Sequence, residues 1–113
     1  MLPKENRLTA KSDFEAVREN GRMFSGRNFS LSYRNRGDEK KTRFGFVVSK
    51  KVSKRAVERN RAKRVLREIV RKNISSVKAG FDCIFLVKKA FLGMKSSEVE
   101  VEVKEALKKF EII

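Results

Sequence analysis

Arginine and lysine side chains gather in one segment of the chain, where they could bind phosphate groups. Residues 50–72 hold eleven basic and two acidic residues, so this segment carries +9 of the formal net charge of +15. The other 90 residues carry the remaining +6. A guanidinium group forks onto two phosphate oxygens and also stacks on bases, whereas an ammonium group acts as a point charge. The segment is therefore suited to binding a polyanion, and nucleic acid is the leading candidate.

The side chains that most often carry out protein-borne catalysis are scarce. The sequence has no His and a single Cys, Cys83, which removes the commonest general base, the commonest metal ligand and any internal disulfide. Cys83 lies in an apolar run, where core packing is its expected role. Asp13, Asp38 and Asp82 are scattered, without the paired spacing of a metal-dependent nuclease. We therefore expect no catalytic side chain and no metal site on the protein.

An anionic membrane surface is the rival partner for so basic a chain. No apolar run approaches the ~18–20 residues that a membrane-spanning helix needs. Residues 1–7 contain no apolar stretch of the kind found in a secretory signal. At this length one domain is the usual outcome. We therefore expect a single nucleic-acid-binding domain over residues 1–113 that is cytoplasmic and binds no membrane.

A helix is needed to arrange the basic residues on one surface. Apolar residues recur at helical spacing over residues 57–73, which predicts a helix with one buried stripe. The stripe consists of Ala62, Val65, Leu66, Ile69 and Val70. Asn60 and Arg64 flank a row of four basic residues that stack at i+4 spacing on the opposite side: Arg59, Lys63, Arg67 and Arg71. Like charges at this spacing destabilise a helix by roughly 0.2–0.5 kcal/mol per pair, so the row favours an anionic partner over an ordinary solvated face.

Two further helices are expected, one near each end of the chain. Ser12 with Glu15 has the spacing of a capping box, which predicts the start of a short helix that Gly21 ends. Ser97 with Glu100 has the same spacing and predicts a closing helix. The apolar stripe of the closing helix consists of Val99, Val103, Leu107 and Phe110.

Two segments alternate in polarity as strands do. Residues 28–34 place Phe29, Leu31 and Tyr33 on one face, and residues 42–49 alternate less regularly. Gly37 lies in the polar stretch between the segments and marks a turn. The pattern therefore predicts that the two strands pair as a hairpin.

The remaining strand and the fold class follow from the second half of the chain. Residues 81–87 form a nearly continuous apolar run, which is typical of a strand buried on both faces. The pattern also allows a further short strand near residues 22–27. The order of elements is roughly α-β-β-(β)-α-β-α, which predicts an α/β fold of the α+β sandwich kind, with one mixed sheet of about four strands and helices packed on it.

The basic segment resembles the signature of a known family. Residues 59–68 read Arg-Asn-Arg-Ala-Lys-Arg-Val-Leu-Arg-Glu and follow Ser49-Lys50-Lys51-Val52. This is similar to the protein component of bacterial ribonuclease P, in which a strand ending in Lys-Lys precedes an Arg-Asn-Arg helix. Three further runs match the family pattern: Asp13-Phe14, Phe44 to Val48, and Phe81-Asp82 through Lys88-Lys89.

The resemblance implies both a function and an unusual topology. Members of the family bind a large catalytic RNA, and that RNA hydrolyses the phosphodiester bond that releases the 5′ leader from precursor tRNA. The holoenzyme uses Mg²⁺ that is bound mainly by RNA, and a 1:1 ratio of protein to RNA is implied. The fold carries a left-handed β-α-β crossover, and a cleft between the first helix and the sheet takes the single-stranded leader.

Candidate contact residues follow from the resemblance and the helical row. Arg61 lies nearer the apolar flank than the other basic residues of the motif. Phe14 matches an aromatic of the leader cleft, with core packing as its alternative role. Arg18 stands where the family often has a second aromatic, and Ser30 and Ser32 stand where it often has bulkier residues. The candidates for RNA contact are Lys50, Lys51, Arg59, Asn60, Arg61, Lys63, Arg64, Arg67 and Arg71. The candidates for the leader cleft are Phe14, Arg18, Ser30 and Ser32.

Two other functions fit the sequence less well. A structural ribosomal protein would share the basic patch, but such proteins more often carry extended basic tails. A DNA-binding protein could insert the arginine-rich helix into a major groove, yet the sequence has no compact helix-turn-helix pair and no dimerisation seam.

Overall fold

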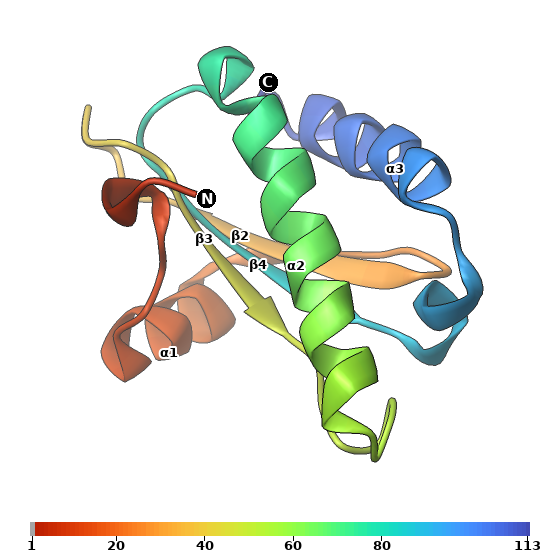
Figure 1. The fold of residues 1–113 in the computed structure, drawn as a ribbon. Coiled ribbons are helices and arrows are strands. Elements are labelled where there is room, and N and C mark those ends of the chain that lie inside the picture. Colours follow the sequence, from red (N-terminus) through yellow and green to blue (C-terminus); the bar gives the residue numbers. More distant parts are fainter. Residues whose placement is uncertain (1) are drawn as a thin grey trace.

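The computed structural model describes residues 2–113. Four strands and three α-helices follow one another along the chain (Figure 1). Their bounds are α1 Lys11–Asn20, β1 Arg22–Ser25, β2 Phe29–Asn35, β3 Arg43–Val47, α2 Ala56–Lys72, β4 Phe81–Val87 and α3 Ser96–Lys109. Short 3-10 turns occur at η1 Lys4–Asn6, η2 Ile74–Ser76 and η3 Lys89–Gly93.

The strands form one mixed sheet in the order β1-β2-β4-β3. β2 is antiparallel to β1 and to β4, whereas β3 is parallel to β4. The predicted hairpin between residues 28–34 and 42–49 is therefore wrong, because β4 lies between those two strands. The hairpin of the sheet joins β1 to β2, and the strand expected near residues 22–27 is β1.

The β3-α2-β4 unit has the unusual hand. In Figure 1, β3 points down the page, α2 passes in front of the sheet and β4 lies to the right of β3. With parallel strands this arrangement is a left-handed crossover, against the right-handed rule that nearly all such units obey. The expectation drawn from the family resemblance is confirmed.

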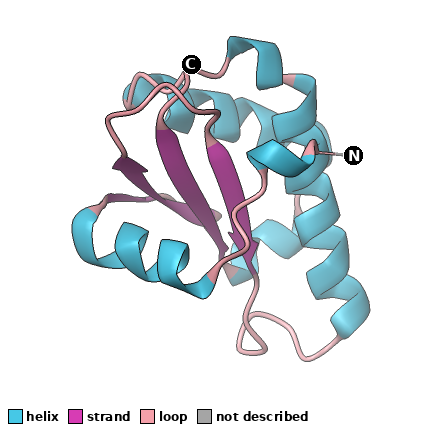
Figure 2. Cartoon of the chain, turned by 90° about the vertical axis from the view of Figure 1, so that its left-hand side faces the viewer, coloured by secondary structure: helices cyan, strands magenta, loops and turns pink. Residues whose placement is uncertain are grey.

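Helices cover both faces of the sheet. In Figure 2 the sheet lies between α1 on the left and α2 on the right. Alternation along β4 separates the two faces: Cys83 and Phe85 belong to the main core beneath α2 and α3, and Ile84 packs with Leu8 and Val17 on the α1 side. The continuous apolar run of β4 is thus explained by burial on both faces.

Phe85 lies at the centre of the main core. Its side chain is completely buried, and its ring lies 5.5 Å from that of Phe29, 6.3 Å from that of Phe44 and 5.8 Å from that of Phe46, measured between centroids. The predicted stripe of α2 packs over this cluster, with Leu66 fully buried and Val65 half-buried. Three strands and a helix thus meet at one aromatic cluster, which positions α2 on the sheet.

Both predicted capping boxes are wrong. α1 begins at Lys11 after Ala10, which makes no side-chain cap, so Ser12 lies inside the helix. α3 begins at Ser96, and the Glu98 carboxylate accepts a hydrogen bond from the backbone N–H of Lys95 at 3.1 Å. The spacing signal occurs by chance in a chain rich in Ser and Glu, and backbone geometry decides which residue caps the helix. Gly21 does end α1, as predicted.

The Cys83 thiol is expected to be unreactive in the folded protein. The side chain is fully buried, and burial raises its pKa far above the ordinary value for cysteine. Because the thiolate is the reactive form, a raised pKa leaves the group protonated at pH 8, where an exposed cysteine is partly ionised. A chromogenic thiol reagent at pH 8 should label Cys83 only after a denaturant unfolds the chain. Rapid labelling of native protein would contradict the buried position.

Candidate nucleic-acid interface

One side of α2 is exposed and strongly basic. Arg61, Arg64 and Arg67 are exposed, whereas Arg59 and Lys63 are half-buried. Asn60 is also exposed and lies next to Arg61 and Arg64 on the helix surface. The opposite stripe is buried, so the helix has a fixed orientation and presents this basic surface to solvent. Arg61 is therefore as accessible as its neighbours, although its helical angle lies nearer the apolar stripe.

The loop between β3 and α2 is fastened beside the basic surface. The Arg59 guanidinium donates to the backbone oxygen of Ser53 at 2.9 Å, and the Ser53 hydroxyl donates to Glu58 at 2.6 Å. The backbone N–H of Arg55 donates to the same hydroxyl at 3.1 Å. Lys50 and Lys51 lie exposed at the tip of this loop. These contacts extend the basic surface from α2 onto an ordered loop.

Most of the basic side chains of α2 have no acidic partner within residues 2–113. Neither a hydrogen bond nor an ion pair to a described residue engages Arg61, Lys63, Arg64 or Arg67. Arg71 differs, because it pairs with Glu68 one turn away, and hydrogen bonding to Arg71 lowers the pKa of the Glu68 carboxyl. The free basic charge is thus concentrated on the middle of α2, and Arg71 is partly neutralised at its end.

The four leader-cleft candidates lie on α1 or on the sheet face that α1 covers. Phe14 is half-buried with its ring over Gly45, and Arg18 is exposed one turn further along α1. Ser32 is half-buried opposite Ile84. Ser30 is only 5% exposed, so it packs inside the fold and offers little surface to a ligand. Three of the four candidates therefore remain accessible.

A groove joins the two sets of candidate residues. It has a volume of about 330 Å³ and lies at the outer edge of β3, with Phe14 on one side and Lys63 and Arg67 on the other. The N-terminal segment also lines it: Arg7 forms a bridge with Phe44, and the backbone N–H of Leu8 donates to the Phe44 oxygen at 2.9 Å. A single strand of nucleic acid could therefore pass from the α1 face to the basic face of α2.

The sequence alone did not indicate two residues of these surfaces. Arg7 lines the groove only because the N-terminal segment runs beside β3, and no local pattern marks it. Met23 is 62% exposed and stands opposite Ser32 in the sheet register. The weak strand signal near residues 22–27 could have placed Met23 on the α1 face, had its partner strand been known.

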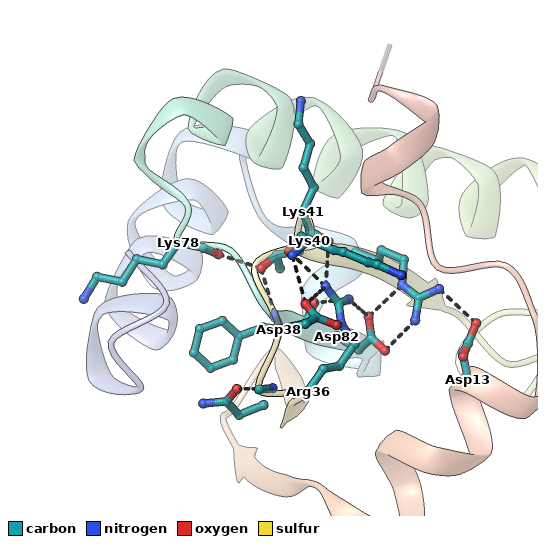
Figure 3. A network of polar contacts seen from close by, with 12 residues as sticks. Asp13, Arg36, Asp38, Lys40, Lys41, Lys78 and Asp82 are labelled. Atoms are coloured by element: carbon teal, nitrogen blue, oxygen red, sulfur yellow. Dashed lines mark hydrogen bonds and ion pairs between the residues drawn. The ribbon is translucent and has the colours of Figure 1, made fainter.

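A network of ion pairs joins α1, β3, β4 and the loop after β2 (Figure 3). Asp82 on β4 is completely buried, and the Arg43 guanidinium donates to both of its oxygens at 2.8 Å. Arg36 donates to Asp82 at 2.5 Å and to both oxygens of Asp38 at 3.0 Å. The remaining nitrogen of Arg43 donates to Asp13 on α1 at 3.1 Å. Hydrogen bonding to Asp82 raises the pKa of Arg43 above its ordinary value, so the Arg43 guanidinium keeps its positive charge.

The sequence model of the family described as Ribonuclease P matches residues 2–111. The chain belongs to this family. It is 38% identical over 113 residues to the ribonuclease P protein component of Pseudanabaena sp., an alignment that covers 100% of this chain and 97% of that one. It is 44% identical over 88 residues to the component of Finegoldia magna, with 78% and 75% of the two chains covered.

Solved structures of ribonuclease P proteins share the fold. An RNase P protein mutant of Staphylococcus aureus, described as defective in mRNA degradation activity, superposes with a TM-score of 0.88 at 27% identity, over 97% of this chain and 92% of that one. The protein of Thermotoga maritima gives a TM-score of 0.81 at 28% identity, with 91% and 96% covered. The predicted α+β fold and the family assignment are therefore both confirmed.

Membership of the ribonuclease P family fixes the broad function. The chain is a protein component of the ribonucleoprotein endoribonuclease that processes tRNA 5′ ends, so an RNA subunit and precursor tRNA are its partners. Within residues 2–113 there is no group of three acidic or cysteine side chains placed to hold a metal ion. None of the helices in that part of the chain is long and apolar enough to cross a membrane.

Proposed function

We propose that the basic surface of α2 and its preceding loop bind the catalytic RNA of ribonuclease P. The observation that carries the proposal is the set of basic side chains in the middle of α2 that lack an acidic partner among residues 2–113. Their helix cannot rotate away, because its other side is buried. The contact residues are Lys50, Lys51, Arg59, Asn60, Arg61, Lys63, Arg64 and Arg67, with Arg71 in a lesser role.

We further propose that the α1 face of the sheet binds the 5′ leader of precursor tRNA. Phe14, Arg18 and Ser32 are accessible there, and the groove at the edge of β3 leads from Phe14 to Lys63 and Arg67. Proteins that bind single-stranded nucleic acid usually combine aromatic rings, on which bases stack, with basic side chains along the backbone. With one half-buried aromatic on this face of α1, leader contact depends on charge and hydrogen bonds as well as on stacking.

In this proposal the RNA subunit carries out the hydrolysis. The holoenzyme uses Mg²⁺ that is held mainly by RNA, and the side chains of this protein place the leader and neutralise phosphates near the cleavage site. Residues 1–113 act as one RNA-binding domain, with one copy per catalytic RNA, in the cytoplasm.

Cleavage of a precursor tRNA by the cognate catalytic RNA at low Mg²⁺ tests the proposal. Adding this protein should strongly increase the rate at which an intact 5′ leader is released, because added basic groups lower the need for bound cations. The control is the same reaction at high Mg²⁺, where the protein should matter less. Well-folded protein that gave no stimulation at low Mg²⁺ would contradict the proposed role.

A further inference from the structure

The position of α1 on the sheet decides where Phe14 lies. The apolar cluster beneath this helix is small: Leu8, Val17 and Ile84 are buried in it, and Phe14, Val47 and Leu86 pack against them half-buried. The start of α1 has no side-chain cap. A polar contact in the first turn of α1, which carries Asp13 and Phe14, therefore adds to a small apolar contact in holding the helix.

The ion pair between Asp13 and Arg43 is this polar contact. Arg43 uses two of its three guanidinium nitrogens on the buried Asp82, so its planar group cannot swing. The third nitrogen points at Asp13 and donates to it at 3.1 Å, with both side chains about 30% exposed. The buried carboxylate of β4 thus positions a carboxylate on α1 through one rigid guanidinium.

A second contact between α1 and β3 lies beside this ion pair. Gly45 follows Arg43 on the same face of β3, and Phe14 follows Asp13 on α1. A Cβ atom built on Gly45 would lie 2.6 Å from the Phe14 ring, so the ring sits directly on the strand backbone. Any movement of the first turn of α1 would therefore move Phe14 relative to β3.

We propose that Asp13 and Arg43 are positioning residues for the leader cleft, holding α1 so that Phe14 faces the single-stranded leader. The inference rests on the proposed function, because it assumes that Phe14 contacts the leader. Neither residue needs to touch RNA in this role. Their effect should therefore depend on the leader and not on the catalytic RNA.

The test compares Asp13→Asn with Glu15→Gln in the reconstituted holoenzyme. Both substitutions turn an α1 carboxylate into an amide, but Glu15 is exposed and makes no ion pair with a described residue. The substrates are precursor tRNAs with a leader of several nucleotides or of one nucleotide. Asp13→Asn should raise KM about fivefold for the long leader only, a size typical of one partly exposed ion pair. The value of kcat, the affinity for catalytic RNA and the effect of Glu15→Gln should stay near wild type.

Further variants separate a positioning role from a merely structural one. Asp13→Glu should leave the KM for the long leader close to the wild-type value, because it retains the carboxylate. Gly45→Ala should displace Phe14 without touching the ion pair and should reproduce the leader-specific increase even if Asp13→Asn folds poorly. Equal KM changes for both substrates, or an Asp13→Asn variant that behaves like Glu15→Gln, would overturn the inference.

A parallel Phe14→Ala variant distinguishes this inference from the proposed leader contact. A leader-specific rise in KM for Phe14→Ala together with wild-type behaviour of Asp13→Asn refutes the positioning role alone. If Phe14→Ala leaves both substrates unchanged, the leader contact is refuted and the positioning role is refuted with it.

Discussion

Replacing Asp82 with asparagine is expected to lower the free energy of unfolding by about 3–5 kcal/mol, the usual cost of removing one partner from a buried ion pair. Asp82 is completely buried and accepts hydrogen bonds from both Arg36 and Arg43. The Arg36 side chain is itself only 9% exposed. The amide would leave two guanidinium groups near a site that no longer carries a negative charge.

Thermal or urea unfolding followed by circular dichroism measures the effect. Asp38→Asn is the matched control, since it removes the other carboxylate of Arg36 at a position that water reaches. Asp82→Asn should lower Tm by more than about 10 °C, and Asp38→Asn should lower it much less. Similar losses for the two variants would show that the buried carboxylate has no special role.

Neutralising Arg64 and Arg67 together is expected to weaken binding to the catalytic RNA roughly 100-fold at low salt, given two lost charge-assisted contacts. Both side chains are exposed and make no ion pair within the described chain, so their removal should leave the fold intact. Each phosphate contact releases counterions, and the log–log dependence of affinity on salt should therefore become shallower by between about one and two. Filter binding of Arg64→Gln/Arg67→Gln over a range of salt concentrations gives both numbers.

The matched control for this variant lies on α3. Lys104→Gln/Lys108→Gln removes the same charge from exposed positions of a helix that packs beside α2, and among the described residues it breaks only the 3.7 Å ion pair of Lys104 with Glu100. It should change the affinity far less and leave the salt dependence nearly unaltered. Equal losses from the two double variants would mean that overall charge, and not the α2 surface, controls binding.

Local patterns predicted individual elements well, because the buried face of a helix or strand makes apolar residues recur at a regular spacing in the sequence. The helix over residues 57–73 and the strand over 81–87 are observed as α2 and β4 with nearly the same bounds. Strand pairing was predicted wrongly, since alternation tells which side chains of a strand share a face but not which strand is its neighbour in the sheet. The loop after β2 illustrates the difficulty: Arg36 donates to Phe81 and Asp82 and ties the loop to β4, a contact across more than 40 residues that no local window contains.

The same distinction applies to the candidate site. The basic surface of α2 was visible because its residues are neighbours along one helix. The groove at the edge of β3 was not, as it combines Arg7, Phe14 and Lys63 from three separate elements. Asp13, Arg43 and Asp82 were noticed singly or not at all, because a charge network spread over the chain leaves no spacing to recognise.

The central place of β4 also has a consequence for how the chain folds. β2 and β3 share no ladder. β3 gains its partner strand, and β2 gains its second partner strand, only when residues 81–87 are in place. During synthesis, therefore, the N-terminal 80 residues can form helices and the β1–β2 hairpin but cannot close the sheet. Such non-local pairing slows folding relative to a protein of local contacts, and it leaves strand edges and apolar surface open in the nascent chain until residues 81–87 have left the ribosome.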